Sequence, residues 1–144
     1  MDTVRRNTRN GSHRAAQNVL VIGGDRFGLA VAEYLTEDAQ SVTFVSETKL
    51  VDITDSVKSL HRTLSGANDI QALASENADT DLVVVIGSDS QALLVGYLIR
   101  RELDSCDVVA GISNPANASA FGGTGVEYID IPQILAERIC DRYE

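Results

Sequence analysis

The sequence is poor in several residue types that mark particular classes of protein. Among 144 residues there are two cysteines, two histidines, two prolines and no tryptophan. Cys106 and Cys140 are too far apart to indicate a disulfide framework, and no Cys/His spacing is typical of a metal site. No apolar run approaches the ~18 residues that cross a bilayer, and the polar start does not resemble a cleavable signal. We therefore expect a globular protein of the cytoplasm.

Positive charge is also scarce, and it is unevenly placed. Only two residues are lysine, and the net charge is −9. The first 17 residues carry +3, however, which leaves −12 on the remainder. Residues 18–144 are acidic enough to repel polyanions, so we expect no nucleic-acid binding. Aspartate-rich, lysine-poor surfaces are typical of extreme halophiles, although an ordinary acidic domain is the alternative. The arginines of the first segment are Arg5, Arg6, Arg9 and Arg14.

The chain divides into a polar arm and one domain. Residues 1–17 show no apolar period and predict a basic flexible arm, and residues 18–144 have the length of a single domain. Short continuous apolar runs then alternate with helical patterns, as in parallel strands covered by helices. The fold class is α/β: a doubly wound parallel sheet of six strands with helices on both faces. Strands are expected at 19–22, 42–45, 82–86 and 108–110, with weaker ones at 60–64 and 126–129.

Helices are expected between these strands. Apolar residues line one face over 27–35, and Ser65 to Asp69 offer caps for a short helix through Leu73. Ser90 is the expected cap of a helix over 91–101. Residues 92–99 of this helix are uncharged, so it needs cover on two sides and favours a symmetric dimer. Further helices are expected to begin at Asn114-Pro115 and at Asp130.

A glycine-rich turn joins the first strand to the first helix, the context of a dinucleotide-binding fingerprint. Gly23 allows a tight turn, Gly28 allows close packing of helix on strand, and the free amides at the helix start face an anion. Asp25 replaces the middle glycine of G-x-G-x-x-G and adds a negative charge, which Arg26 could offset. The turn indicates either nucleotide binding or a structural turn that only begins a helix.

An acid is expected at the end of the second strand, where it would hold ribose hydroxyls. Ser46 occupies that position and Glu47 follows it. Glu47 favours a ribose contact, whereas Ser46, Thr48 and Lys49 make a 2′-phosphate conceivable, so the choice between NAD and NADP stays open.

The sequence gives little support for catalysis. His13 and His61 have no nucleophile and acid in a known pattern, and no G-x-S-x-G elbow is present. Cys106 is expected to be an exposed thiol and Cys140 to be packed on the last helix. We therefore do not expect an enzyme.

Several motifs occur in the order found in one family. They are Gly23 to Gly28 ending Arg-Phe-Gly, Asp81 to Ser90, Val109 to Pro115, and Gly125 to Arg138. Over Asn18 to Arg142 the chain thereby resembles the nucleotide-binding domain of Trk-type potassium uptake regulators, also called the RCK, KTN or TrkA-N domain. The resemblance implies a Rossmann-like module that binds NAD(H), with ATP, ADP or NADP as alternatives. It also implies a homodimer or larger oligomer that regulates a potassium channel or transporter subunit in the membrane.

The same resemblance implies four groups of binding residues at the carboxyl ends of strands, which converge where the strand order reverses. Departures from the family are Asp25, Ser46, and Gly111 in place of a basic residue. They favour one alternative, a degenerate dimerisation or scaffold domain without nucleotide. A small NAD(P)-dependent oxidoreductase is a separate and less favoured alternative, because no proton donor and no substrate domain are visible in the sequence. The implied residues are Gly23, Gly24, Asp25, Arg26, Phe27 and Gly28 at the phosphates, Ser46 and Glu47 at the ribose, Asn68 and Asp69 beside the adenine, and Gly87, Ser88 and Asp89 after the fourth strand.

Overall fold

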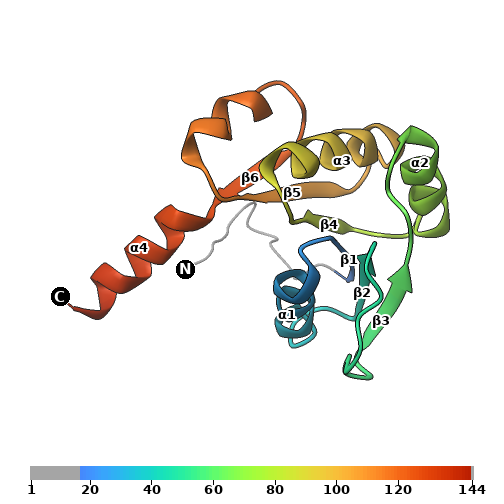
Figure 1. Cartoon of the computed structure of the whole chain (residues 1–144), viewed down its shortest axis with the longest axis horizontal. Helices are drawn as coiled ribbons and strands as arrows, with labels where there is room; N and C mark the ends of the chain where they lie inside the picture. Colours follow the sequence, from blue (N-terminus) through green and yellow to red (C-terminus); the bar gives the residue numbers. More distant parts are fainter. Residues whose placement is uncertain (1–16, 144) are drawn as a thin grey trace.

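One parallel sheet of six strands organises the chain (Figure 1). The computed structural model describes residues 17–143, so the predicted basic arm lies outside the described residues apart from Gln17. The strand order is β3-β2-β1-β4-β5-β6, and all five pairings are parallel. This is the expected doubly wound, Rossmann-like arrangement, in which the order reverses between β1 and β4. The strands are β1 (Asn18–Ile22), β2 (Ser41–Ser46), β3 (Val57–His61), β4 (Leu82–Val85), β5 (Asp107–Ile112) and β6 (Glu127–Asp130).

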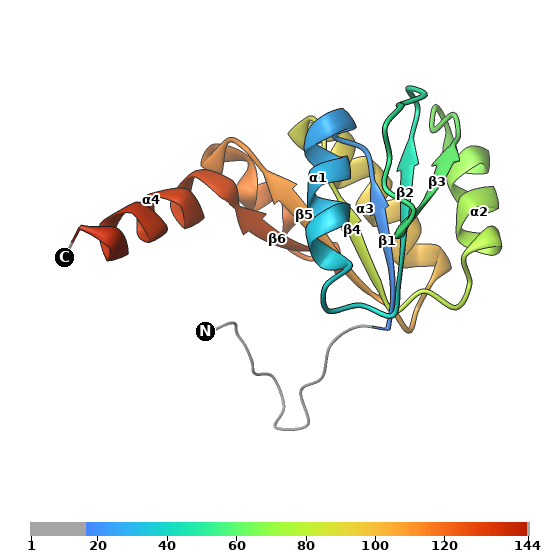
Figure 2. The ribbon, with the colours of Figure 1, turned by 90° about the horizontal axis from the view of Figure 1, so that it is seen from below.

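Helices cover both faces of the sheet and bury two apolar clusters (Figure 2). One face carries the first helix, whose Leu29 packs with Phe44 of β2. The other face carries the next two helices and the 3₁₀ segment, which bury Ile70, Leu73 and Ile99. The helical elements are α1 (Asp25–Leu35), α2 (Ala67–Glu76), α3 (Asp89–Glu102), the 3₁₀ helix η1 (Pro115–Phe121) and α4 (Ile131–Arg142).

The weak third strand begins earlier than the sequence predicts. The structure places β3 at Val57–His61, not at 60–64. Along β3 only Val57 is fully buried, so this edge strand has no apolar alternation to reveal it. Leu64 is buried too, but it belongs to the segment after the strand.

Two helix starts also differ from the prediction. Ser88, not Ser90, caps α3, because its Oγ accepts a hydrogen bond from the Gln91 amide at 3.2 Å. The cap position of α2 is Gly66, which has no side chain to offer. The expected cap of α4 is confirmed, since Asp130 accepts from the Gln133 amide at 3.0 Å.

The two cysteines exchange their predicted environments. Cys106 is only 3% exposed, and burial raises the pKa of its thiol. Cys140 is exposed, because α4 projects away from the sheet instead of packing on it (Figures 1 and 2). The projecting helix leaves Ile134, Leu135 and Ile139 about half exposed or more. Within residues 17–143, no helix has the length and apolarity needed to cross a membrane.

Candidate functional site

A cavity of about 430 Å³ opens at the carboxyl ends of β1, β2 and β4. This is the point where the strand order reverses, and ligands of open α/β sheets bind in this crevice. Its volume falls within the range of small-molecule and cofactor sites. The lining residues are Ile22, Gly23, Gly24, Asp25, Ser46, Glu47, Thr48, Leu64, Val85, Ile86, Gly87, Ser88, Gln91 and Val95.

The turn after β1 is built from three successive residues with positive φ. The angles are 86° at Gly23, 82° at Gly24 and 48° at Asp25. A β-carbon at Gly23 would lie 2.3 Å from the carbonyl oxygen of Ile86, and one at Gly24 would lie 2.7 Å from the Ile86 side chain. Ile86, the residue after β4, therefore leaves room only for glycine at both positions.

Gly28 brings α1 directly onto this turn. Its amide donates to the Gly24 carbonyl at 3.1 Å, and a β-carbon there would stand 1.8 Å from the Gly23 carbonyl oxygen. The packing role expected for Gly28 is thus confirmed. The amino end of α1, with the positive end of its dipole, is thereby held at the cavity edge.

The end of β2 supplies a carboxylate that crosses the crevice. Glu47 accepts a 2.8 Å hydrogen bond from the Leu64 amide through one carboxylate oxygen and a 3.4 Å bond from the Gln91 side chain through the other. The preceding Ser46 is buried, and its hydroxyl accepts from the Thr48 amide at 3.0 Å. Ser46 therefore shapes the turn, and Glu47 presents the acid.

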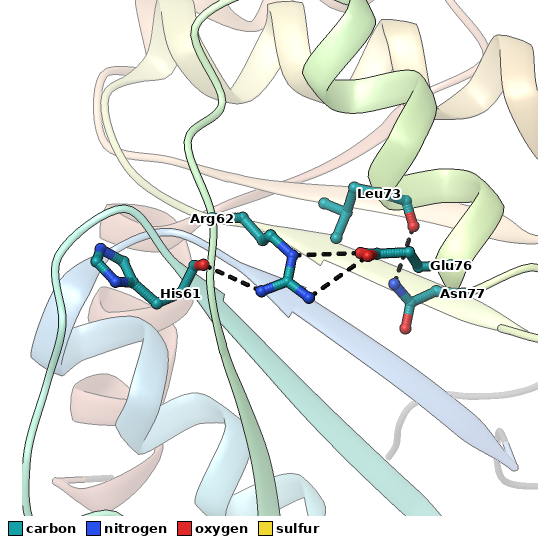
Figure 3. Close-up of polar contacts among 5 residues, drawn as sticks. All are labelled: His61, Arg62, Leu73, Glu76 and Asn77. Carbon is teal, nitrogen blue, oxygen red and sulfur yellow. Dashed lines mark hydrogen bonds and ion pairs between the residues drawn. The ribbon is translucent and has the colours of Figure 1, made fainter.

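The segment after β3 is fixed against α2 by Arg62 (Figure 3). Its guanidinium donates to the His61 carbonyl at 3.1 Å and to both Glu76 carboxylate oxygens at 3.3 and 3.4 Å. The His61 ring lies 2.9 Å from the Glu47 carbonyl oxygen. These contacts fix the segment that leads from β3 to Leu64, the residue whose amide donates to the Glu47 carboxylate.

Asp89 follows the cavity-lining Gly87 and Ser88, yet its carboxylate binds the loop after β5. It accepts hydrogen bonds from the Ser113 amide at 2.9 Å, the Asn114 amide at 3.0 Å and the Asn117 side chain at 2.8 Å. The Ser113 bond, followed by the Asn117 bond, lowers the pKa of Asp89. Asp89 therefore braces the β5 loop against the start of α3.

The cavity brings together only part of the predicted set. Gln91, Thr48 and Leu64 also line it. The sequence pointed to Thr48 as a neighbour of Ser46, and it could have pointed to Gln91, one helical turn beyond Ser88. Asp69 instead accepts from the Ser65 amide and hydroxyl, both at 3.0 Å, at the start of α2. The predicted residues that line the cavity are Gly23, Gly24, Asp25, Ser46, Glu47, Gly87 and Ser88. Those outside its lining are Arg26, Phe27, Gly28, Asn68, Asp69 and Asp89.

The charge of the lining is entirely negative. Asp25 and Glu47 contribute carboxylates, and none of the lining residues in the described part of the chain is a lysine or arginine. A β-carbon at Gly111 would meet the Ile131 side chain at 3.2 Å, so this position faces the start of α4. Among residues 17–143, no group of three His, Cys, Asp or Glu residues could hold a metal ion.

The chain is similar to proteins of known family over most of its length. A Trk system potassium uptake protein TrkA homolog from Methanothermobacter thermautotrophicus is 27% identical over 120 residues, which cover 82% of this chain and 56% of the relative. The chain thus spans little more than half of that relative. The TrkA-N domain of the Escherichia coli inner membrane protein ybaL superposes with a TM-score of 0.69 at 12% identity, covering 89% and 96% of the two chains.

A channel structure has the same fold in one part of its chain. The GsuK channel bound to NAD gives a TM-score of 0.64 at 16% identity, and the match covers 88% of this chain and 23% of the channel. The sequence model of the TrkA-N domain matches residues 19–132. These residues include β2 to β6, all of β1 except Asn18, and every described residue that lines the cavity. The chain is a member of the TrkA-N domain family.

Proposed function

We propose that the domain binds NAD(H) and regulates potassium transport through a membrane partner. The observation that carries this proposal is the cavity at the switch point, which Gly23 and Gly24 of the turn line together with Glu47. A pyrophosphate fits over the Gly23–Asp25 turn at the amino end of α1. The adenosine ribose then lies toward the end of β2.

Glu47 is the proposed ribose ligand. Its bond to the Gln91 side chain is long, at 3.4 Å, and a ribose hydroxyl can replace it without disturbing the 2.8 Å bond from the Leu64 amide. A carboxylate in this position accepts from hydroxyls and repels a 2′-phosphate. This supports NAD(H) over NADP. ADP and ATP share the adenosine part and remain alternatives in the test.

Membership of the TrkA-N family, together with the similarity to a Trk potassium uptake protein, supports a regulatory role. The described lining contains no histidine, lysine, tyrosine or cysteine that could move a proton beside a nicotinamide. Its two acids lie at the turn and at the ribose position. We propose that the domain lies in the cytoplasm and that nucleotide binding favours one of two arrangements of an oligomer, which the membrane partner reads.

Dimerisation is part of this proposal, and α4 supports it. Ile134, Leu135 and Ile139 form an exposed apolar stripe on a helix that leaves its own domain. On the face of the sheet that carries α1, this helix contacts β1 and β2. Ile129 lies farther along the sheet, on β6, and its side chain is 48% exposed. Within the described residues, the apolar stripe of α4 therefore has no partner in its own domain, and the sheet surface at β6 on this face has no covering helix. Both would be buried in a symmetric dimer in which each copy packs its α4 on the sheet of the other.

Calorimetric titration in molar potassium chloride tests the nucleotide proposal. NAD, NADH, ADP and ATP are each titrated into the protein and into Glu47→Gln, with Glu127→Gln as a control that removes one exposed carboxylate on β6. We expect NAD(H) to bind, Glu47→Gln to weaken it about tenfold or more through loss of a charged hydrogen-bond acceptor, and Glu127→Gln to leave it unchanged. No heat with any nucleotide and an intact fold would favour the scaffold alternative.

A further inference from the structure

We propose that Asp25 makes nucleotide affinity rise with ionic strength, so that occupancy of the site reports the salt concentration around the protein. This regulation rests on the proposed function, because it requires a nucleotide in the cavity. The residues that carry it are the two acids of the lining, Asp25 and Glu47.

The position of Asp25 places its charge beside the pyrophosphate. It follows Gly23 and Gly24 directly, lines the cavity and is exposed to solvent. Its φ of 48° is a conformation that glycine adopts without strain and that aspartate tolerates better than most residues.

We infer the sign of the salt effect from the two carboxylates of the described lining, whose repulsion of an anion has to exceed the attraction from the α1 dipole and from Arg26, the residue after Asp25. Ordinary phosphate sites use lysine or arginine, and they lose affinity as salt screens the attraction. This cavity presents two carboxylates and no described basic side chain to an anionic ligand. Screening therefore weakens a repulsion, and the Debye length falls from about 10 Å at 0.1 M to about 3 Å at 1 M salt. Affinity is expected to increase over that range.

Such a response would suit a domain that acts on potassium transport. Potassium salts contribute to the ionic strength that the site would sense, and uptake of potassium would raise nucleotide occupancy. The response needs no dedicated potassium site, because any monovalent salt screens the same charges.

The test compares two aspartates that share one backbone conformation. Asp52, with a φ of 60°, is the other described non-glycine residue with positive φ; it is exposed and lies outside the cavity lining. Asp25→Asn and Asp52→Asn each remove one charge and keep a side chain that tolerates positive φ. The dissociation constant of NADH is measured for the unmodified protein and both variants between 0.1 and 2 M potassium chloride.

We expect NADH to bind the unmodified protein several-fold to about tenfold more tightly at high salt than at low salt. Asp25→Asn should bind more tightly at low salt and respond less to salt, and Asp52→Asn should behave as the unmodified protein. Circular dichroism at each salt concentration restricts the comparison to folded protein. Sodium chloride should give the same result as potassium chloride.

Three results would overturn this proposal and leave the proposed function intact. Affinity that falls with salt in the unmodified protein would show that attraction dominates the site. Equal salt responses in the unmodified protein and Asp25→Asn would remove Asp25 from the effect, and a response to potassium but not sodium would indicate a specific ion site. If folded Asp25→Asn and the unmodified protein bind no nucleotide at any salt concentration, the proposed function fails together with this inference.

Discussion

At the scale of single residues, Gly28 has the least tolerance for a side chain among the glycines of the described domain. The β-carbon of Gly28→Ala would meet the Gly23 backbone at 1.8 Å, and backbone cannot rotate away as a side chain can. We expect a loss of about 3 kcal/mol or more in the free energy of unfolding, measured with urea. Gly122→Ala is the control, because its β-carbon would have only an ordinary 3.5 Å contact. Equal stability of the two variants would contradict the packing shown here.

Asp89 gives a prediction for the pH dependence of stability. Its hydrogen bonds from Ser113 and Asn117 lower its pKa below 3.8 in the folded state. The charged form therefore stabilises the fold above the unfolded pKa, and this contribution is lost as pH falls through the lower, folded pKa. Asp89→Asn should reduce the free energy of unfolding at pH 7 by up to about 1 kcal/mol, a small value because the carboxylate is only partly buried.

The difference between Asp89→Asn and the unmodified protein should stay constant from pH 7 to 5 and shrink below about pH 4. Urea unfolding at constant salt measures it. Asp104→Asn removes one exposed charge elsewhere and should show no such change. A difference for Asp89→Asn that persists at acid pH would mean that its carboxylate charge does not brace the β5 loop.

The site was predictable where one short segment determines it. The turn at Gly23 and Gly28 follows from a strand, two glycines and a helix within ten residues. The environment of Glu47 could not be predicted, because the hydrogen-bond donors to its carboxylate, Leu64 and Gln91, are 17 and 44 residues away in sequence. Asp89 was predicted as a binding residue, but its contact with the loop after β5 was not, because that loop begins 24 residues later in the sequence. Contacts of that kind exist only once the sheet has formed.

At the scale of elements, the start of α3 provides a direct comparison of two serines. Ser88 accepts the Gln91 amide at 3.2 Å and has an extended backbone, whereas Ser90 lies within the helix. Ser88→Ala should lower the free energy of unfolding by about 1 kcal/mol through loss of the cap. Ser90→Ala should have no such effect, since alanine is the better helix former. Thermal and urea unfolding of both variants measure this, and the reverse order would contradict the assignment of the cap.

Elements differ in how far sequence determines them. The continuous apolar runs of β1, β2, β4 and β5 predicted those strands closely, because one face of each is buried and most residues of the other face are at least partly buried. The uncharged residues all round α3 predicted that it is covered on two sides. One side packs on the sheet, and α2 and the 3₁₀ segment cover part of the other. Leu94 and Tyr97 of α3 nevertheless stay exposed. The path of α4 could not be predicted, because its amphipathic pattern is equally typical of a helix packed on its own sheet.

At the scale of the whole molecule, two features determine how the domain interacts with its surroundings. The charge of the acidic surface is screened by salt, and the projecting helix α4 offers a contact to another protein surface. The net charge of −9 gives strong self-repulsion at low salt. The expectation that concentrated salt stabilises the fold, as in halophilic proteins, stays a prediction. The apolar stripe of α4 favours a contact with another surface. Burial of Ile134, Leu135 and Ile139 in that contact would contribute about 1.5–3 kcal/mol for each fully buried side chain.

The dimer prediction is tested on the two sides of α4. Replacement of Ile134, Leu135 and Ile139 by serine should convert a dimer to a monomer in sedimentation equilibrium, because the apolar stripe is lost. Gln133→Ser with Glu137→Ser changes the opposite side, where these two residues bond each other at 3.2 Å, and should leave the dimer intact. Since α4 has few contacts with its own sheet, the triple variant should retain the circular dichroism of the fold. An unmodified protein that is monomeric at micromolar concentration in molar salt, where charge repulsion is screened, would contradict exchange of α4 between copies.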